Sequence, residues 1–162
     1  MFNYWGRFFL PRRALLGSVF FAMLVLQGIA YGASVDSLSV TELTAGTGKE
    51  IRAGHYVIIH YDAWVYDSGK PDGKGQLFDS SRERGETFTF VYGYKRALPG
   101  MEKGMDGMKV GARRLILVPP KLGFDDLKYP YPRDVPTGAS LVFDVELLDV
   151  VPRGAPNPPN ED

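Results

Sequence analysis

The sequence predicts an α+β domain in which an antiparallel, twisted β-sheet wraps around one short α-helix. Two patterns predict this class. Apolar residues alternate along several short runs that end at turn residues, as in β-strands, whereas one further segment repeats its apolar residues at helical spacing. About 130 residues follow an apolar N-terminal segment, which is the usual size of a single domain with a buried core.

The chain begins with an expected leader, residues 1–33. Arg7, Arg12 and Arg13 precede a long apolar run, and small residues follow that run. This arrangement is typical of a secretory signal peptide, so the leading interpretation is export from a bacterial cytoplasm and a periplasmic location. Residues 14–33 could also just span a bilayer as an uncleaved anchor, which needs roughly 20 residues. Either interpretation exports the domain.

A lead-in of residues 34–50 precedes the domain, which we expect to cover residues 51–151. Its first strand is expected over residues 56–66, where apolar side chains from Tyr56 to Ile59 occupy both faces. Burial on both faces is typical of a central strand rather than an exposed edge. We therefore expect this strand at the centre of the sheet.

Three further runs complete the predicted antiparallel sheet. Residues 88–90 alternate phenylalanine and threonine, and residues 113–118 form an apolar run that stops at Pro119 and Pro120. The last strand is expected to bury one face, which carries Leu141, Phe143, Val145 and Leu147.

The predicted helix lies between these strands. Leu98, Met101, Met105 and Met108 recur at helical spacing, and Pro99 stands where a first-turn proline is tolerated. A methionine stripe of this kind is typical of core packing. We expect this helix to lie across the sheet.

Two segments lie outside the compact pattern. Residues 67–75 are rich in turn-forming residues and are expected to form a mobile surface loop. Residues 152–162 form a proline-rich tail with too few apolar groups to offset its ordering entropy, so we expect the tail to be disordered.

Composition argues against several classes of function. Three of the 19 basic residues lie in the leader, which leaves 16 against 19 acidic residues, so the mature chain is mildly acidic and nucleic-acid binding is not expected. The chain has no cysteine, which removes disulfides and thiol catalysis. Its two histidines, His55 and His60, would point to opposite faces of a strand, so neither a metal nor another cofactor is expected.

The most informative stretch is residues 77–85, followed by the aromatic residues 88–90. It places Asp79 among aromatic rings and beside Arg82 and Arg84. Burial raises and a nearby guanidinium lowers the pKa of such a carboxyl group, and the second effect would keep it ionised in a pocket wall. The alternative is an ordinary ion pair at a surface turn.

Five blocks of sequence change that balance, because their order and spacing match one family. They are residues 57–61, 78–82, 98–105, 108–111 and 139–147. The chain from Ile51 to Val150 thereby resembles the FKBP-type peptidyl-prolyl isomerases, the immunophilin family that binds macrolides such as rapamycin. The resemblance implies an FKBP-like fold, proline-containing polypeptides as substrates, a macrolide such as rapamycin as a possible ligand, and a monomer.

The resemblance also implies a site. Its catalytic residues would be Tyr61, Phe78, Asp79 and Phe143, and its substrate-binding residues would be Phe88, Arg84, Ala97, Leu98, Met101, Phe124 and Val135. Asp79, held by Tyr61 and Arg84, would face the twisting carbonyl. The backbone amide of Leu98 would bind a substrate carbonyl.

Two departures from the family's pattern concern this site. Met101 stands where the family usually has a tryptophan, and Phe124 stands where many members have a tyrosine. Methionine presents less rigid area to a ring, and phenylalanine has no hydroxyl donor, so macrolide affinity should fall. Residues 125–134 also replace a shorter, glycine-rich flap.

Two functions follow from these observations. The first is an exported prolyl isomerase that assists protein folding by stabilising a twisted amide without covalent chemistry. The second is a non-catalytic chaperone or proline-segment binder with weakened isomerase activity, which Met101 and Phe124 favour. On either hypothesis the chain contacts a membrane only through an uncleaved leader.

Overall fold

A computed structural model of the chain describes residues 34–125 and 132–155. The predicted leader, six residues of the 125–134 segment and most of the predicted tail lie outside the described residues. Within the described residues, no helix has the length and apolar character needed to cross a membrane.

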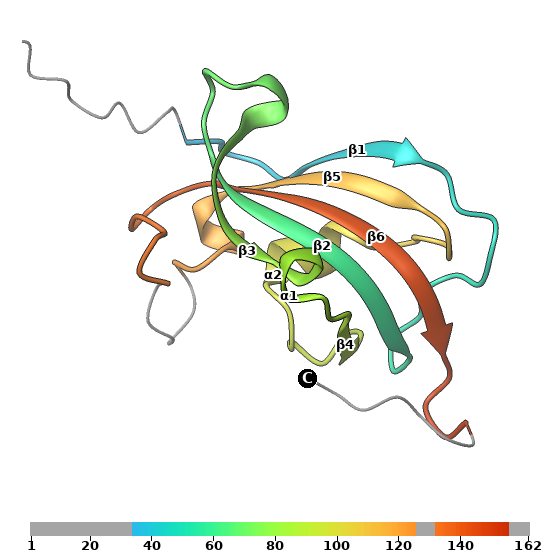
Figure 1. Ribbon diagram of the computed structural model, residues 1–162. Helices are drawn as coiled ribbons and strands as arrows, with labels where there is room; N and C mark the ends of the chain where they lie inside the picture. The colour runs from blue at the N-terminus through green and yellow to red at the C-terminus, as the bar shows by residue number, and fades with distance from the viewer. Residues whose placement is uncertain (1–33, 126–131, 156–162) are drawn as a thin grey trace, which may run out of the picture.

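One six-stranded antiparallel sheet organises the molecule, with strand order β1-β5-β6-β2-β3 and with β4 paired to β2 (Figure 1). The strands are β1 (Ser39–Thr44), β2 (Tyr56–Tyr66), β3 (Lys74–Ser80), β4 (Phe88–Val91), β5 (Arg113–Val118) and β6 (Leu141–Val151). The helices are α1 (Ser81–Arg84), α2 (Pro99–Gly104) and two short 3₁₀ turns, η1 (Pro71–Gly73) and η2 (Pro120–Leu122). This architecture confirms the predicted α+β class.

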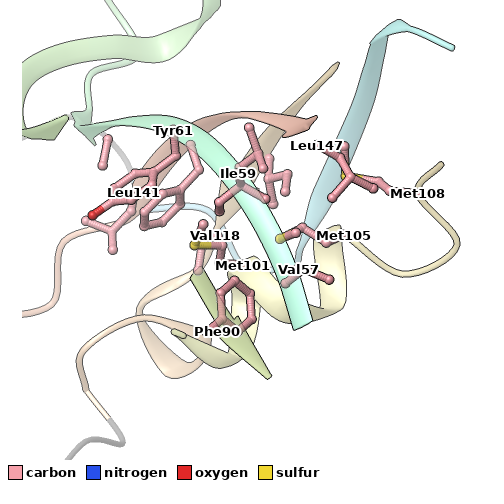
Figure 2. Close-up of a cluster of buried hydrophobic side chains, with 14 of the residues drawn as sticks. Val57, Ile59, Tyr61, Phe90, Met101, Met105, Met108, Val118, Leu141 and Leu147 are labelled. Atoms are coloured by element: carbon pink, nitrogen blue, oxygen red, sulfur yellow. The ribbon is translucent and has the colours of Figure 1, made fainter. Parts of the chain in front are cut away.

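β2 is the central strand, as its sequence predicts. It pairs with β6 along one side, while β4 and β3 share the other side. Its residues alternate between buried and half-buried positions over the whole length. The buried face consists of Val57, Ile59, Tyr61, Ala63 and Val65, and Figure 2 shows part of this face opposite Met101 and Met105.

β6 buries the predicted face only as far as Leu147. A register shift opposite Ile58 and Ile59 follows. Strict alternation would next bury position 149, which is an aspartate, but the next buried residue is Val150. A β-bulge inserts one extra residue and so moves the alternation by one position. After the bulge, the side chains that face the core are therefore those at even rather than odd positions.

The structure places a strand, β1, inside the expected lead-in of residues 34–50. β1 pairs with β5 and forms one edge of the sheet. All six of its residues are exposed, so it lacks the apolar alternation by which a half-buried strand is found in a sequence.

α2 is shorter than the methionine spacing predicts. It ends at Gly104, Met105 forms its C-terminal cap, and Met108 lies beyond it, although Met105 and Met108 are both buried. Gly107 has a positive φ of 68°, a conformation that reverses the chain and ends the helical path. The stripe thus belongs to the core, as expected, but only its first part is helical.

Gly104 brings α2 close to β5, and this contact carries a first prediction. A Cβ at this position would lie 2.4 Å from Cγ2 of Ile116, whose branched side chain is stiff. We expect Gly104→Ala to lower the free energy of unfolding by about 1 to 2 kcal/mol, because overpacking outweighs the gain in helix propensity. Urea denaturation measures the change. Gly69→Ala, at an exposed position, is the control and should change stability by less than about 0.5 kcal/mol; an equal loss in both variants would contradict the close packing.

The turn-rich segment of residues 67–75 contains η1 and the first residues of β3. It projects away from the sheet between β2 and β3 (Figure 1). Gly73 is nevertheless buried, and a Cβ there would meet the Tyr66 ring at 2.5 Å. The segment is therefore packed against β2 at Gly73, just before β3 begins.

Candidate functional site

A pocket of about 190 Å³ lies where β2, β3, β4 and β6 meet the start of α2. Its lining consists of Tyr61, Phe78, Asp79, Phe88, Arg96, Ala97, Leu98, Met101, Phe124 and Phe143. The structure therefore brings together all but two of the site residues proposed from the sequence. Arg84 and Val135 do not line this pocket, and Arg96 is an addition.

An interruption in strand pairing opens the pocket beside Tyr61. β4 pairs with β2 as far as Ile59, and β3 pairs with β2 only from Asp62 onward. Between them, the backbone N–H of Tyr61 donates to Oγ of Ser81, the first residue of α1, at 2.8 Å. Tyr61 thus lies in a gap at this edge of β2, between the end of β3 and the start of β4.

α1 is held in this gap by its own capping groups. Ser80 Oγ accepts a hydrogen bond from the Glu83 backbone N–H at 3.0 Å, and Gly85 ends the helix with a positive φ of 72°. Ser81 Oγ also lies 3.0 Å from Nδ1 of His60. These contacts fix the position from which Arg84 reaches Asp79.

Aromatic rings form most of the pocket wall. The Phe78 ring meets Phe124 edge to face at 6.1 Å between centroids and meets Phe143 at 6.4 Å. Tyr61 and Phe88 pack in the same manner at 5.7 Å. Edge-to-face packing suits the charge distribution of aromatic rings. The wall is therefore apolar and held in a defined shape.

Asp79 places a carboxylate in this apolar wall. Tyr61 Oη donates a hydrogen bond to its Oδ2 at 2.5 Å, and the Arg84 guanidinium forms an ion pair with its Oδ1. Arg84 Nη2 also donates to Tyr61 Oη at 3.2 Å. Arg84 thus contacts the site through these two residues rather than by lining the pocket.

The Tyr61 hydroxyl remains protonated in this arrangement. Burial and the hydrogen bond to the Asp79 carboxylate raise the pKa of Tyr61 to about 12, against the opposite effect of Arg84. Across the physiological range, Tyr61 is therefore a donor that holds Asp79 in place.

Leu98 presents a backbone donor at the pocket. Its carbonyl accepts the first hydrogen bond of α2, from the Glu102 N–H at 3.0 Å. Its own N–H makes no hydrogen bond with any residue in the described ranges. A helix start leaves such N–H groups without intrahelical partners, and this one can donate to a bound carbonyl.

Val135 is not among the residues that line the pocket. Its N–H bonds to the Pro132 carbonyl at 3.0 Å in a turn, and its side chain is buried in the hydrophobic core. The same core cluster contains the pocket residues Tyr61, Met101 and Phe143. The preceding residues 126–131, part of the unusual segment that replaces a short flap, lie outside the described residues.

Arg96 is the pocket residue that sequence reasoning missed. It is exposed and directly precedes Ala97 and Leu98, both proposed from the sequence. Its position next to Ala97 and Leu98 is the signal by which the sequence could have indicated it. Within the described parts of the chain, no group of three or more His, Cys, Asp or Glu side chains could hold a metal ion.

The chain is similar to known proteins over most of its length. The family model for FKBP-type peptidyl-prolyl cis-trans isomerases matches residues 47–148. The chain is similar to FK506-binding protein 2B of Rhizopus delemar, with 34% identity over 143 residues that cover 82% of this chain and 65% of that relative. It is also 32% identical to an FK506-binding protein of Neisseria meningitidis serogroup C over 116 residues, covering 72% of this chain and 98% of that protein.

A solved structure shows the same fold. The crystal structure of FkpA from Escherichia coli aligns with a TM-score of 0.58 and 30% identity, over 76% of this chain and 53% of that protein. This chain thus spans about two thirds of the Rhizopus relative and about half of the Escherichia coli protein.

Proposed function

The chain belongs to the FKBP-type peptidyl-prolyl cis-trans isomerase family, and from this premise we propose that it catalyses cis-trans isomerisation of X-Pro bonds in exported polypeptides. The observation that carries the proposal is the Asp79 carboxylate, held by Tyr61 and Arg84 in the wall of an aromatic pocket. The proposal includes a periplasmic location reached through the leader, with anchoring by residues 14–33 as the alternative. It also includes macrolides as ligands of the same pocket.

The chemistry requires no covalent step. Rotation about an X-Pro amide meets a barrier of about 18–20 kcal/mol because planarity preserves resonance. A site accelerates rotation when it binds the twisted amide more tightly than the planar one. Proline offers an apolar ring, and the pocket offers Tyr61, Phe88, Met101 and Phe143 around it.

The two polar groups at the pocket suit a twisted amide. Loss of resonance returns electron density to the nitrogen and leaves the carbonyl carbon more electrophilic, so the Asp79 carboxylate can face it. The Leu98 N–H, which has no partner among the residues that the structure describes, can bind a neighbouring carbonyl of the substrate and fix its orientation. Both groups act on a substrate whose proline ring is held in the aromatic part of the pocket.

The proposal is tested by measuring how fast the full-length protein isomerises peptides with Leu, Phe, Ala or Glu before proline. The assay is run with and without rapamycin. We expect Asp79→Leu to lower kcat/KM about tenfold. A preorganised electrostatic group in a water-excluded site is worth about 10² to 10³, but the Asp79 side chain is 36% exposed, so water screens part of its effect. Asp36→Leu, at an exposed position outside the pocket, is the matched control.

Each outcome has a definite meaning. Unchanged kcat/KM in a folded Asp79→Leu variant would remove Asp79 from the mechanism. A folded wild-type chain that binds proline peptides without turnover would favour the second candidate, a non-catalytic binder. The presence of Met101 and Phe124 in the pocket lining supports that candidate, because both reduce the rigid or hydrogen-bonding surface offered to substrate.

A further inference from the structure

A second, larger hollow adjoins the proline pocket. It has a volume of about 810 Å³ and shares Ala97 with the pocket lining. Tyr92, Pro99 and Leu122 contribute its apolar surface. A polypeptide whose proline occupies the pocket therefore has an adjoining groove into which its neighbouring residues can extend.

Three lysines distinguish this groove, and they come from different parts of the chain. Lys95 lies in the loop before α2, Lys103 lies in α2, and Lys121 lies in η2. All three are exposed, and their side chains make no ion pair or hydrogen bond within residues 34–125 and 132–155. Other cations of the described residues do have a carboxylate partner, among them Lys49, Lys74, Arg82, Arg84, Arg113 and Arg114.

Two acidic residues, Glu102 and Asp106, also line the groove. Glu102 is half-buried, and its buried Oε1 has no hydrogen-bond partner among the described residues. Asp106 is exposed, and its carboxylate lies 3.5 Å from the Tyr92 hydroxyl. The three lysines therefore outnumber the carboxylates and leave an excess of positive charge beside the pocket.

We propose that this lysine groove, defined by Lys95, Lys103 and Lys121, binds the residues that flank the proline of the substrate and selects segments carrying Asp or Glu. The inference rests on the proposed function, because it takes the proline pocket as the anchor of the same polypeptide. It names the substrate class of that site: proline segments with acidic residues about two to four positions away, the distance that an extended chain of roughly 7–14 Å covers.

The expected preference is modest and depends on salt. A single exposed ion pair changes an equilibrium about 1.5- to 5-fold, so two or three such pairs should give about a threefold to tenfold preference for acidic over neutral peptides. Salt screens exposed charges, with a Debye length of about 10 Å at 0.1 M ionic strength. The preference should accordingly shrink towards unity as salt is added.

The test uses the full chain and labelled peptides with one Leu-Pro bond, in which the residues two to four positions before or after proline are all Glu, all Gln or all Lys. Fluorescence anisotropy gives each Kd at low and at high salt. The double variant Lys103→Gln/Lys121→Gln should bring the ratio of Gln-peptide to Glu-peptide Kd close to one. Lys95 is left in place because its φ of +58° would make its replacement a backbone change as well.

The matched control is Lys70→Gln/Lys109→Gln. It removes the same charge at two exposed lysines that line neither the pocket nor the groove. A ratio that falls in the groove variant and persists in the control supports the inference, and the side of proline on which acid is favoured gives the direction of binding. Equal Kd values for Glu and Gln peptides at low salt, or an equal fall in both variants, would overturn it.

Isomerisation of the Gln peptide by the unmodified chain separates this inference from the proposed function. Turnover of that peptide without an acidic preference would reject the proposed role of the groove and support the proposed isomerase activity. An acidic preference that depends on the lysines, without turnover, would keep the groove and reject the isomerase. Failure of every peptide to bind would reject both.

Discussion

Ile59→Ala is expected to lower the free energy of unfolding by about 3 to 4 kcal/mol, within the range seen when a fully buried isoleucine is truncated. Ile59 is 0% exposed and lies on the buried face of β2, the strand that pairs with β6, β4 and β3. Figure 2 shows its side chain in the centre of the cluster of buried side chains. Truncation removes apolar contacts and leaves a cavity. The cavity cannot collapse, because β4 and β6 pair with β2 on both sides of Ile59.

Ile58→Ala provides the control for this change. Ile58 is the preceding residue of the same strand and is half-buried on the opposite face, so its truncation should cost only about 1 kcal/mol. Urea denaturation of both variants measures the difference as a shift of the midpoint at an unchanged m value. Equal losses in the two variants would show that the core does not lie on the face that the structure gives it.

Asp144→Asn is expected to lower the free energy of unfolding by about 2 to 3 kcal/mol at neutral pH. The Asp144 side chain is only 1% exposed, and its two oxygens accept from Arg113 at 2.7 and 3.0 Å and from Lys74 at 2.8 Å. Removing one charge from a buried pair costs about 3–5 kcal/mol. We expect less here because Arg113 is 46% exposed and can turn to water.

This loss should depend on pH in a definite direction. Burial alone would raise the pKa of the Asp144 carboxyl, but the hydrogen bonds and positive charges of Arg113 and Lys74 lower it below its usual value. A lowered folded-state pKa gives stability that is present above the unfolded-state pKa of about 3.9 and is lost as pH falls through the folded-state value. The difference between wild type and Asp144→Asn should therefore be full at pH 7 and shrink below about pH 4.

Denaturation of the two proteins across this pH range measures the effect. Asp36→Asn is the control, because Asp36 is exposed and makes no ion pair or hydrogen bond with the part of the chain that the structure describes. It should differ little from wild type at either pH. A difference for Asp144→Asn that stays constant down to low pH would show that its charge is not the source of the stability.

Several elements could be predicted from sequence because their signals are local. Apolar residues on both faces predicted the central strand over residues 56–66, and Pro119 marked the end of β5. Signals failed where the residues carry no pattern. β1 is exposed along its whole length, and α2 ends at Gly104 although the methionine spacing continues to Met108. The positive φ of Gly107 keeps the helical path from continuing to Met108, although the apolar spacing does continue.

The candidate site divides in the same way. Its residue types and their order along the chain, with the family resemblance they carry, were readable because five short blocks preserve them. Their placement depended on packing between distant segments: a gap in strand pairing beside Tyr61 opens the pocket, and α1 holds Arg84 behind Asp79.

The amino-acid sequence was therefore sufficient for the class of fold, the central strand and the chemistry of the pocket wall, since neighbouring residues encode burial period and side-chain type. The tertiary structure alone determines which side chains share a cavity. The lysine groove illustrates the reason: its three cations are separated by up to 26 positions in the chain and become neighbours only when α2 and η2 pack beside the same loop.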